Sequence, residues 1–285
     1  MIAVTGATGQ LGRLVIGRLL DKVPAQQVVA LARDPGKASD LAARGVQVRE
    51  ADYDRPQTLE RALAGVDKLL LVSSSEIGKR ARQHAAVIAA ARHAGVQLIA
   101  YTSVLHADVS PLGLAEEHRQ TEAALAASGI PHVLLRNGWY AENYMLGIPT
   151  ALQYGVVLGS AGEGRISSAS RADYADAAAA VLMAGDAQAG RVYELAGGSH
   201  FTLAQFAAEL ARQSGKPVTY QDMPEAAYKA ALLGAGLPEP VAQLLADSDA
   251  SAAKGALHGT EPDLERLIGR PAATLQQAVA AALKS

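Results

Sequence analysis

Three evenly spaced glycines near the start of the chain are suited to contact with a phosphate group. They are Gly6, Gly9 and Gly12. They follow a short apolar run and precede a segment in which apolar residues recur every three or four positions, as in a helix. A strand, a glycine-rich turn and a helix in this order present backbone N–H groups and a positive helix dipole to a pyrophosphate. The spacing is G-x-x-G-x-x-G rather than G-x-G-x-x-G, and turns are rich in glycine for other reasons too. In this context the segment nevertheless predicts a dinucleotide-binding site.

Each glycine has a distinct expected role. Gly6 permits the tight turn, because glycine adopts backbone conformations that other residues avoid. Gly9 lets backbone N–H groups approach the pyrophosphate, and Gly12 lets the helix pack close to the strand.

The end of the second expected strand indicates which dinucleotide is bound. A site for NAD places an acidic residue there, to hold the ribose 2′-hydroxyl. Arg33 occupies this position, and a guanidinium suits the additional 2′-phosphate of NADPH. Asp34 follows directly, so NAD is not excluded, but an aspartate before Pro35 also fits a helix N-cap. We therefore expect NADPH to be preferred over NADH.

The composition bounds the class of protein. The chain has 285 residues, 49% of them hydrophobic and 19% charged, and a net charge of −2. This length can bury one large domain or a domain with an additional lobe. The charge balance gives no reason to expect a nucleic-acid partner or membrane insertion. Without cysteine there is no thiol nucleophile or disulfide, and no metal site is expected. The first residues are expected to form a strand rather than a signal peptide, so we expect a cytoplasmic protein.

Apolar strands alternate with helical patterns as far as Arg136, which predicts an α/β fold with a parallel, doubly wound Rossmann sheet. Strands are expected near residues 1–5, 27–32, 46–50, 68–73, 96–102 and 131–135. Helices are expected near residues 10–21, 36–43, 57–64, 79–94, 114–128, 171–184, 202–214, 224–234, 238–247 and 275–283. We expect residues 1–150 to form an NADP-binding domain and residues 151–285 a smaller, mainly helical substrate lobe that closes the cleft. A strand near 191–195 is expected to return to the main sheet.

Hydroxyl residues follow the apolar parts of the fourth and fifth expected strands. Because ligands bind beyond the carboxyl ends of parallel strands, these side chains are expected to line the crevice. Single serines at such positions also cap helices, but two strands that end alike favour a ligand contact. The residues concerned are Ser73, Ser74, Ser75, Tyr101, Thr102 and Ser103.

The chain lacks the usual proton donor of short-chain dehydrogenases, a tyrosine whose pKa is lowered by a lysine four residues later. None of the nine tyrosines has a lysine at that position, and no lysine occurs between Lys79 and Lys216. This argues against alcohol–ketone interconversion, and so against a ketone- or sugar-nucleotide-modifying enzyme on the same fold. Reduction of a quinone, which can take its protons from water, remains open. So does a sensor that binds the dinucleotide without turnover.

The histidines offer no clear replacement. His106 follows the fifth strand and could donate a proton or lie in a surface loop. His118 and Glu122 are four residues apart on a helix, a spacing that can orient an imidazole but is more typical of a surface pair. His84 and His93, on a helix with several arginines, are expected on a solvent-exposed face. We therefore name no catalytic residue.

Several motifs together resemble one known family. The chain is similar to the NmrA-like atypical short-chain dehydrogenases, essentially from Met1 to the C-terminus. Some members of that family are redox sensors that act through a protein partner, which is the alternative to an enzyme that reduces a small-molecule quinone. A homo-oligomer is left open. The motifs that carry the resemblance are TGATGQLG, LARDP, LLLVSSSE, AYTSVLHADVSPLGLAEEH, LLRNGWYAENY and SRADYADAA.

The resemblance implies roles for the matching residues. The turn would hold the pyrophosphate, Arg33 the 2′-phosphate, and the serines would lie along the ribose and the bridging region. Asn137 to Glu142 would border the nicotinamide, where Trp139 and Tyr140 either flank the nicotinamide or quinone or pack in the core. Arg171 would add a charged contact. The family also lacks the Tyr/Lys pair, so no catalytic side chain is transferred. The expected cofactor-binding residues are Gly6, Ala7, Thr8, Gly9, Gln10, Leu11, Arg33, Ser73, Ser74, Ser75, Asn137, Gly138, Trp139, Tyr140, Ala141, Glu142 and Arg171.

Overall fold

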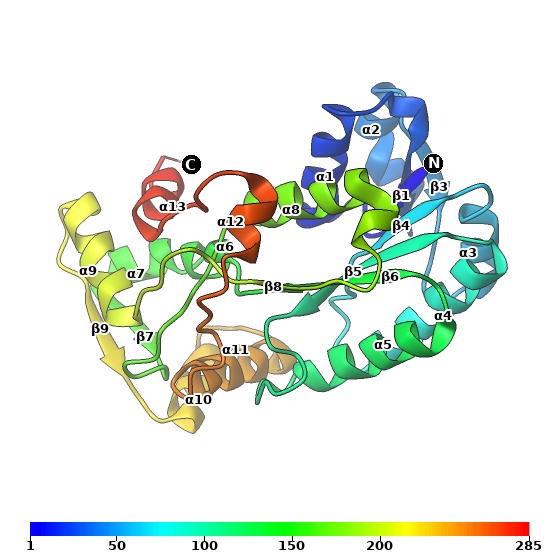
Figure 1. Ribbon diagram of the computed structural model, residues 1–285. Helices are drawn as coiled ribbons and strands as arrows, with labels where there is room; N and C mark the ends of the chain where they lie inside the picture. Colours follow the sequence, from blue (N-terminus) through cyan, green and yellow to red (C-terminus); the bar gives the residue numbers. More distant parts are fainter. Residues whose placement is uncertain (285) are drawn as a thin grey trace. The chain divides into compact units, whose positions relative to one another are not determined.

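The structure is a computed structural model that describes residues 1–284, and the packing divides them into two compact units (Figure 1). Both units combine segments that are far apart in the sequence. Unit 1 comprises residues 1–107, 117–137 and 171–193. Unit 2 comprises residues 108–116, 138–170 and 194–284. The expected functional division at residue 150 stays a prediction, because compactness does not report which part of the chain binds which ligand.

The main sheet has seven strands in the order β3-β2-β1-β4-β5-β6-β8. The strand pairs from β1 to β6 are all parallel, which confirms the predicted doubly wound sheet. The six strands expected in the first half of the chain are all present, with ends shifted by a residue or two. The strands are β1 (Ile2–Val4), β2 (Val28–Ala32), β3 (Gln47–Glu50), β4 (Lys68–Leu71), β5 (Leu98–Val104), β6 (His132–Asn137) and β8 (Val192–Leu195).

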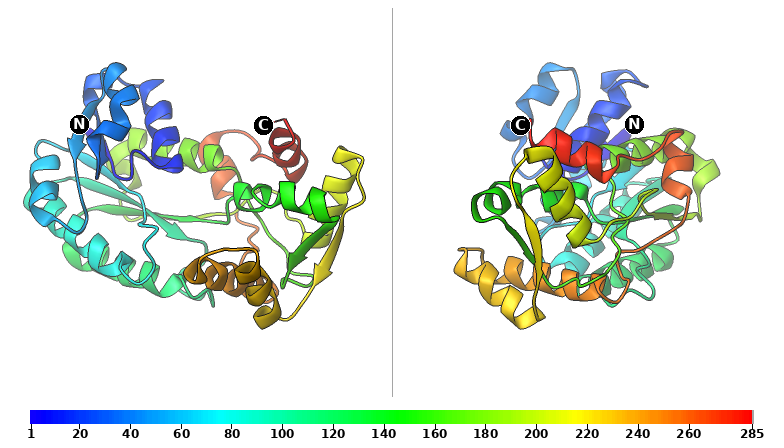
Figure 2. Two further views of the ribbon diagram at one scale, coloured as in Figure 1. Left: turned by 180° about the vertical axis from the view of Figure 1, so that it is seen from behind. Right: turned by 90° about the vertical axis from the view of Figure 1, so that its left-hand side faces the viewer.

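Helices cover both faces of this sheet, as Figures 1 and 2 show. Two helices that pack against each other lie on one face, namely α1 (Gln10–Leu20) and α8 (Arg171–Ala184). Three lie on the other face, namely α3 (Pro56–Ala62), α4 (Arg80–His93) and α5 (Ala115–Ser128). Shorter helical segments complete the connections, namely η1 (Ala25–Gln27), η2 (Pro35–Ala38), α2 (Ser39–Ala43) and η3 (Gly185–Gln188).

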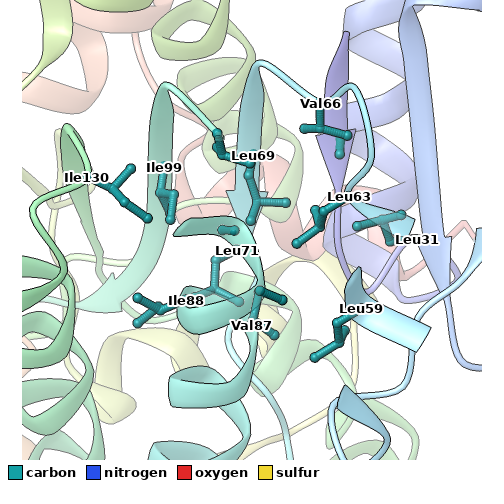
Figure 3. Close-up of a cluster of buried hydrophobic side chains, with 14 of the residues drawn as sticks. Leu31, Leu59, Leu63, Val66, Leu69, Leu71, Val87, Ile88, Ile99 and Ile130 are labelled. Atoms are coloured by element: carbon teal, nitrogen blue, oxygen red, sulfur yellow. The ribbon is translucent and has the colours of Figure 1, made fainter. Parts of the chain in front are cut away.

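A cluster of buried apolar side chains fills the space between the sheet and α3 and α4 (Figure 3). Leu31, Leu69 and Leu71 come from strands, and Leu59 and Val87 from helices; none is more than 1% exposed. Full burial of such a side chain stabilises the fold by about 1.5–3 kcal/mol. The cluster therefore holds the carboxyl ends of the strands, and the loops that follow them, in place.

Unit 2 is mainly helical, as predicted, but it also contains a small sheet in which β7 (Val156–Gly159) pairs in parallel with β9 (Thr219–Asp222). These strands escaped prediction because each has only four residues and β9 is largely polar. Within residues 1–284, no helix is both long enough and apolar enough to span a bilayer. The helices of this unit are α6 (Ala141–Met145), α7 (Ile148–Tyr154), α9 (Leu203–Ser214), α10 (Glu225–Gly234), α11 (Glu239–Ala252), α12 (Asp263–Ile268) and α13 (Leu275–Ala282).

Candidate dinucleotide-binding site

The glycine turn after β1 has the shape that the sequence predicts. Gly6 has a φ of +59°, a left-handed conformation that glycine adopts without strain. Gly9 is the N-cap of α1, and its N–H donates to the Gly6 carbonyl oxygen at 2.9 Å. A Cβ on Gly12 would lie only 2.3 Å from that same oxygen, so glycine alone fits there. The close approach brings the first N–H groups of α1, which have no partner within the helix, up to the turn.

A cavity of about 290 Å³ lies over the carboxyl ends of β1 to β4. The strand order changes direction between β1 and β4, and open α/β sheets bind ligands at such a point. The volume is near the low end of the range for small-molecule sites, about 300–1,000 Å³. Ala7 does not line the cavity, because its side chain is fully buried and its N–H donates to the Leu31 carbonyl oxygen at 3.2 Å. The expected residues that line it are Gly6, Thr8, Gly9, Gln10, Leu11, Arg33, Ser73, Ser74 and Ser75.

Charged side chains form one rim of the cavity. Arg33 is 71% exposed, and its Nη1 donates to Glu76 Oε1 at 2.8 Å. Glu76 Oε2 lies 3.1 Å from Lys79 Nζ, so Arg33 and Lys79 share this carboxylate, and Asp52 adds a second carboxylate to the cavity lining. Asp34 caps η2 and accepts the Gly36 N–H at 3.0 Å. The helix-cap interpretation of Asp34 is therefore confirmed.

The loop after β4 is held from behind by buried polar side chains. The Ser73 N–H donates to Thr102 Oγ1 at 2.8 Å, and the Ser74 N–H donates to His84 Nε2 at 2.9 Å. Thr102 is 2% exposed and His84 is completely buried. These bonds fix the backbone of the loop, while all three of its serines, Ser75 included, line the cavity.

The prediction that the end of β5 lines the crevice is wrong for Tyr101, Thr102 and Ser103. Their exposed fractions are 0%, 2% and 5%, and none of them lines the cavity. The reason is that β5 continues to Val104, so these residues lie inside the strand rather than beyond its end. The Tyr101 hydroxyl bonds to His118 Nδ1 at 2.7 Å instead.

Two expectations about histidines are also wrong. His84 is completely buried and His118 is 4% exposed, so neither lies on a solvated face. His84 shares the inward face of α4 with buried apolar residues, a pattern that the neighbouring arginines conceal in the sequence. Burial, with a smaller effect of the Arg80 charge, lowers the pKa of His84 to about 3 and that of His118 well below its usual value. Both imidazoles are therefore neutral near pH 7. His93 is exposed, as expected.

Asn137 and Arg171, two further expected cofactor contacts of unit 1, lie outside the cavity lining. Asn137 is the last residue of β6 and is 5% exposed. Its Oδ1 is buried and has no hydrogen-bond partner among the described residues. Arg171 is half-buried and begins α8. Their contact with a cofactor stays a prediction.

The expected stretch from Gly138 to Glu142 belongs to unit 2. The Gly138 N–H donates to the Leu195 carbonyl oxygen at 3.0 Å, and Trp139 and Tyr140 are half-buried. Ala141 begins α6 and is 5% exposed. Backbone bonds therefore anchor this stretch within its own unit, and its role at a nicotinamide also stays a prediction.

Sequence reasoning missed four polar side chains of the cavity, Asp52, Tyr53, Glu76 and Gln83. The Tyr53 hydroxyl donates to the Val72 carbonyl oxygen at 3.1 Å, and burial raises the pKa of this phenol. Asp52 and Tyr53 follow β3 closely, so the rule that identified the serines after β4 would also have identified them. Glu76 directly follows those serines. Gln83 lies within α4 and carries no such signal.

Known proteins resemble the chain along its whole length. Quinone oxidoreductase 2 of Escherichia coli strain K12 is 58% identical over 279 residues, which cover 98% of this chain and 97% of the relative. The NAD(P)H azoreductase of Xenophilus azovorans is 30% identical over 279 residues, with 97% and 96% covered.

Solved structures agree with this likeness. An NADPH-dependent quinone oxidoreductase of Escherichia coli complexed with NADPH has a TM-score of 0.97 and 57% identity, and the match covers 99% of this chain and all of the other. The triphenylmethane reductase of Citrobacter sp. complexed with NADP(H) has a TM-score of 0.95 and 40% identity over 99% and 100% of the two chains. An NmrA mutant, with 16% identity and a TM-score of 0.78 over 98% of this chain and 93% of the other, shares the fold.

The family model described as NAD(P)H-binding matches residues 6–184, a match that begins at the first glycine of the turn. It covers more than half of the chain. The chain therefore belongs to the NAD(P)H-binding family, and its fold is that of the NmrA-like atypical short-chain dehydrogenases.

Proposed function

We propose that this protein is an NADPH-dependent quinone oxidoreductase. The observation that carries the proposal is full-length similarity to quinone oxidoreductase 2 together with a cavity that combines the glycine turn with Arg33. NADPH is the proposed cofactor and a small-molecule quinone the proposed substrate.

The residues of the cavity fit NADPH. At Gly12 a Cβ would fill the space in which α1 approaches the turn, so the backbone there is shaped for close contact. Arg33 lines the cavity with an exposed guanidinium, a group that pairs well with a 2′-phosphate. We therefore assign the turn residues to the pyrophosphate, Arg33 to the 2′-phosphate, and Ser73 to Ser75 to the ribose and the bridging region.

The nicotinamide end of the proposed site rests on Asn137. Its buried Oδ1 lacks a partner within the described residues, and a buried polar atom without one is costly unless a ligand supplies it. The carboxamide of a nicotinamide could donate to this oxygen. Gly138, Trp139, Tyr140, Ala141 and Glu142, which follow in the chain, and Arg171 are proposed to contribute to the same end of the site.

When bound, NADPH supplies the hydride with which a quinone is reduced. The task of the protein is then to bind and orient the two reactants and to exclude water. The absence of a Tyr/Lys pair fits this task, because the oxygens of a reduced quinone can take protons from water. No side chain is assigned as proton donor.

The test is to mix the purified protein with NADPH and a simple benzoquinone and to follow the absorbance of the reduced nicotinamide. Rapid, saturable loss of absorbance, much slower with NADH, is the expected result. Tight NADPH binding without loss of absorbance would instead identify a sensor that acts through a protein partner. Absence of NADPH binding would overturn the proposal entirely.

We propose the cellular location, the partners and the functional division of the chain on the same grounds. We place the protein in the cytoplasm, with no nucleic-acid partner, and assign the NADP site to residues 1–150 and the substrate lobe to residues 151–285. Cell fractionation tests the location. Sedimentation of the purified protein decides whether a homo-oligomer forms.

A further inference from the structure

Ser74 stands out because all three of its polar groups are bonded to one helix. Its N–H donates to His84 Nε2 at 2.9 Å, and its carbonyl oxygen accepts from Arg80 Nε at 2.8 Å. Its hydroxyl donates to Gln83 Oε1 at 2.5 Å. These three partners, Arg80, Gln83 and His84, all lie within the first five residues of α4. None of them is more than 7% exposed.

We propose that Arg80, Gln83 and His84 are positioning residues that fix Ser74, and with it the Ser73–Ser75 loop, in the wall of the nucleotide cavity. The inference rests on the proposed function, since it names residues that determine how tightly NADPH is held. His84 is its central member, because it lies behind the loop and does not line the cavity.

The hydrogen bonds of His84 show which of its two ring nitrogens carries the proton. The Ser74 N–H can only donate, so Nε2 of His84 must accept and its Nδ1 must carry the proton. Nδ1 then donates to Thr121 Oγ1 at 2.9 Å, and the Thr121 hydroxyl donates to the Glu117 carbonyl oxygen at 2.8 Å. This series of hydrogen bonds connects the Ser73–Ser75 loop to α5. It can form only while the imidazole of His84 is neutral.

The surroundings keep the imidazole neutral. Tyr53 and Tyr101 meet its ring edge-on, with ring centroids 6.2 Å and 5.4 Å away. Burial, and to a smaller extent the charge of Arg80 in α4, lowers the pKa of His84 to about 3. From α5, Glu117 faces Arg80 at 3.6 Å and His118 bonds to Tyr101. The bond from Ser74 therefore persists across the physiological pH range.

A purely structural role would not require these residue types. Burying a polar side chain costs free energy unless its hydrogen bonds are made, and apolar side chains could fill the same space behind the loop that follows β4. Arg80, Gln83 and His84 instead direct polar atoms at one residue of the cavity wall. Glu117 stabilises the start of α4 in turn, because its carboxylate accepts the N–H groups of Gly78 and Arg80 at 3.1 Å and 2.9 Å.

The experiment compares His84→Phe with His84→Gln, whose side-chain amide can both accept and donate. His93→Phe, at an exposed position on the same helix, is the matched control. For each variant, the Kd of NADPH is measured by nicotinamide fluorescence, KM and kcat by quinone reduction, and Tm by thermal unfolding. We expect His84→Phe to raise the Kd and KM of NADPH about tenfold with little change in kcat, since one buried hydrogen bond is lost. His84→Gln should restore most of the affinity, and His93→Phe should resemble the wild type.

A fall in Tm with an unchanged Kd for NADPH would show that His84 merely packs, and would overturn the inference. If His84→Phe does not fold, Thr121→Val decides, because it removes the hydroxyl behind Nδ1 while keeping the shape. We expect it to raise the Kd about threefold and Thr121→Ser to restore it; equal Kd values for Thr121→Val and the wild type would overturn the inference.

The two proposals fail in different ways. If the wild type binds NADPH without reducing quinones, the proposed function is wrong, while the Kd series still tests His84. If wild type and His84→Phe bind NADPH equally and both turn over, the positioning role is wrong and the proposed function stands. If the wild type binds no NADPH, both are overturned.

Discussion

Two parts of the same cavity are built in opposite ways. The glycine turn from Gly6 to Gly12 is made of backbone whose shape is fixed by close packing, since a Cβ on Gly12 would lie 2.3 Å from the Gly6 carbonyl oxygen. The rim formed by Arg33, Glu76 and Lys79 is made of side chains, and Arg33 is 71% exposed. One part is rigid and nearly uncharged, whereas the other is adaptable and charged.

The two parts of the cavity are therefore expected to have different roles in binding. A pyrophosphate is common to NADH and NADPH, so a rigid backbone cradle determines whether any dinucleotide binds. Only NADPH carries the 2′-phosphate, so the charged rim determines which of them is preferred. Changes in the turn should therefore weaken both dinucleotides equally, and changes in the rim should alter their ratio.

The largest effect is expected for Gly12→Ala. The new Cβ would force the Gly6 carbonyl group to move, which should lower the free energy of unfolding by about 1–3 kcal/mol. A displaced turn should weaken NADPH and NADH alike, by roughly 100-fold. Isothermal titration with both dinucleotides and thermal unfolding measure these effects.

Gly17→Ala is the matched control in the same helix, because apart from its chain neighbours and the backbone of its own helix no atom lies within 4 Å of its added Cβ. This substitution should stabilise the fold by about 0.5–1 kcal/mol and leave binding unchanged. A Gly12→Ala variant that loses only NADPH affinity would break the proposed distinction between turn and rim.

Arg33→Ala should have the next largest effect, and only on NADPH. The lost contact with the 2′-phosphate should cost about 1–2 kcal/mol, less than most charged hydrogen bonds contribute, because the side chain is exposed to solvent. NADPH affinity should fall about 5- to 30-fold while NADH affinity stays the same, as measured by fluorescence titration. Arg92→Ala, at an exposed position on α4, controls for the loss of one positive charge. Equal losses for both dinucleotides would mean that Arg33 does not contact the 2′-phosphate.

The two parts also differ in how well the sequence predicts them. The turn is local: Gly6, Gly9 and Gly12 lie within seven residues, and steric limits on the backbone decide their conformation. Arg33 was identified in the same way, from its place at the end of one strand. The parallel, doubly wound sheet followed from the alternation of strands and helices, because parallel strands require crossover connections.

Some contacts that the sequence does not reveal join residues that are far apart in the chain. Glu76 pairs with Arg33 across 43 positions, and His84 bonds to Thr121 across 37. No local pattern reveals such partners, and the arginines of α4 made a buried histidine resemble a solvated one. The buried Tyr101 was misplaced for a different reason, since the end of β5 was set too early.

Glu76→Gln tests one of these missed residues and should produce a smaller effect of opposite sign. The Glu76 carboxylate occupies Arg33 Nη1 and repels an incoming phosphate, although it also holds Lys79 nearby. Because exposed ion pairs contribute about 0.2–1 kcal/mol, the amide should tighten NADPH about two- to fivefold without changing NADH. Fluorescence titration of both dinucleotides measures the ratio. Weaker NADPH binding by Glu76→Gln would show that Glu76 orients Arg33 rather than competing for it.

The smallest expected effect is that of salt on the wild type. Screening acts over about 10 Å at 0.1 M ionic strength and about 3 Å at 1 M, so exposed charges lose much of their interaction at high salt. The rim around Arg33 is exposed, whereas the turn binds through backbone groups held by packing. Raising the sodium chloride concentration should therefore reduce the preference for NADPH over NADH by about two- to threefold. Arg33→Ala should show no such change in preference, because its rim no longer distinguishes the dinucleotides. If the preference of the wild type is insensitive to salt, the 2′-phosphate is held in a desolvated pocket rather than at this exposed rim.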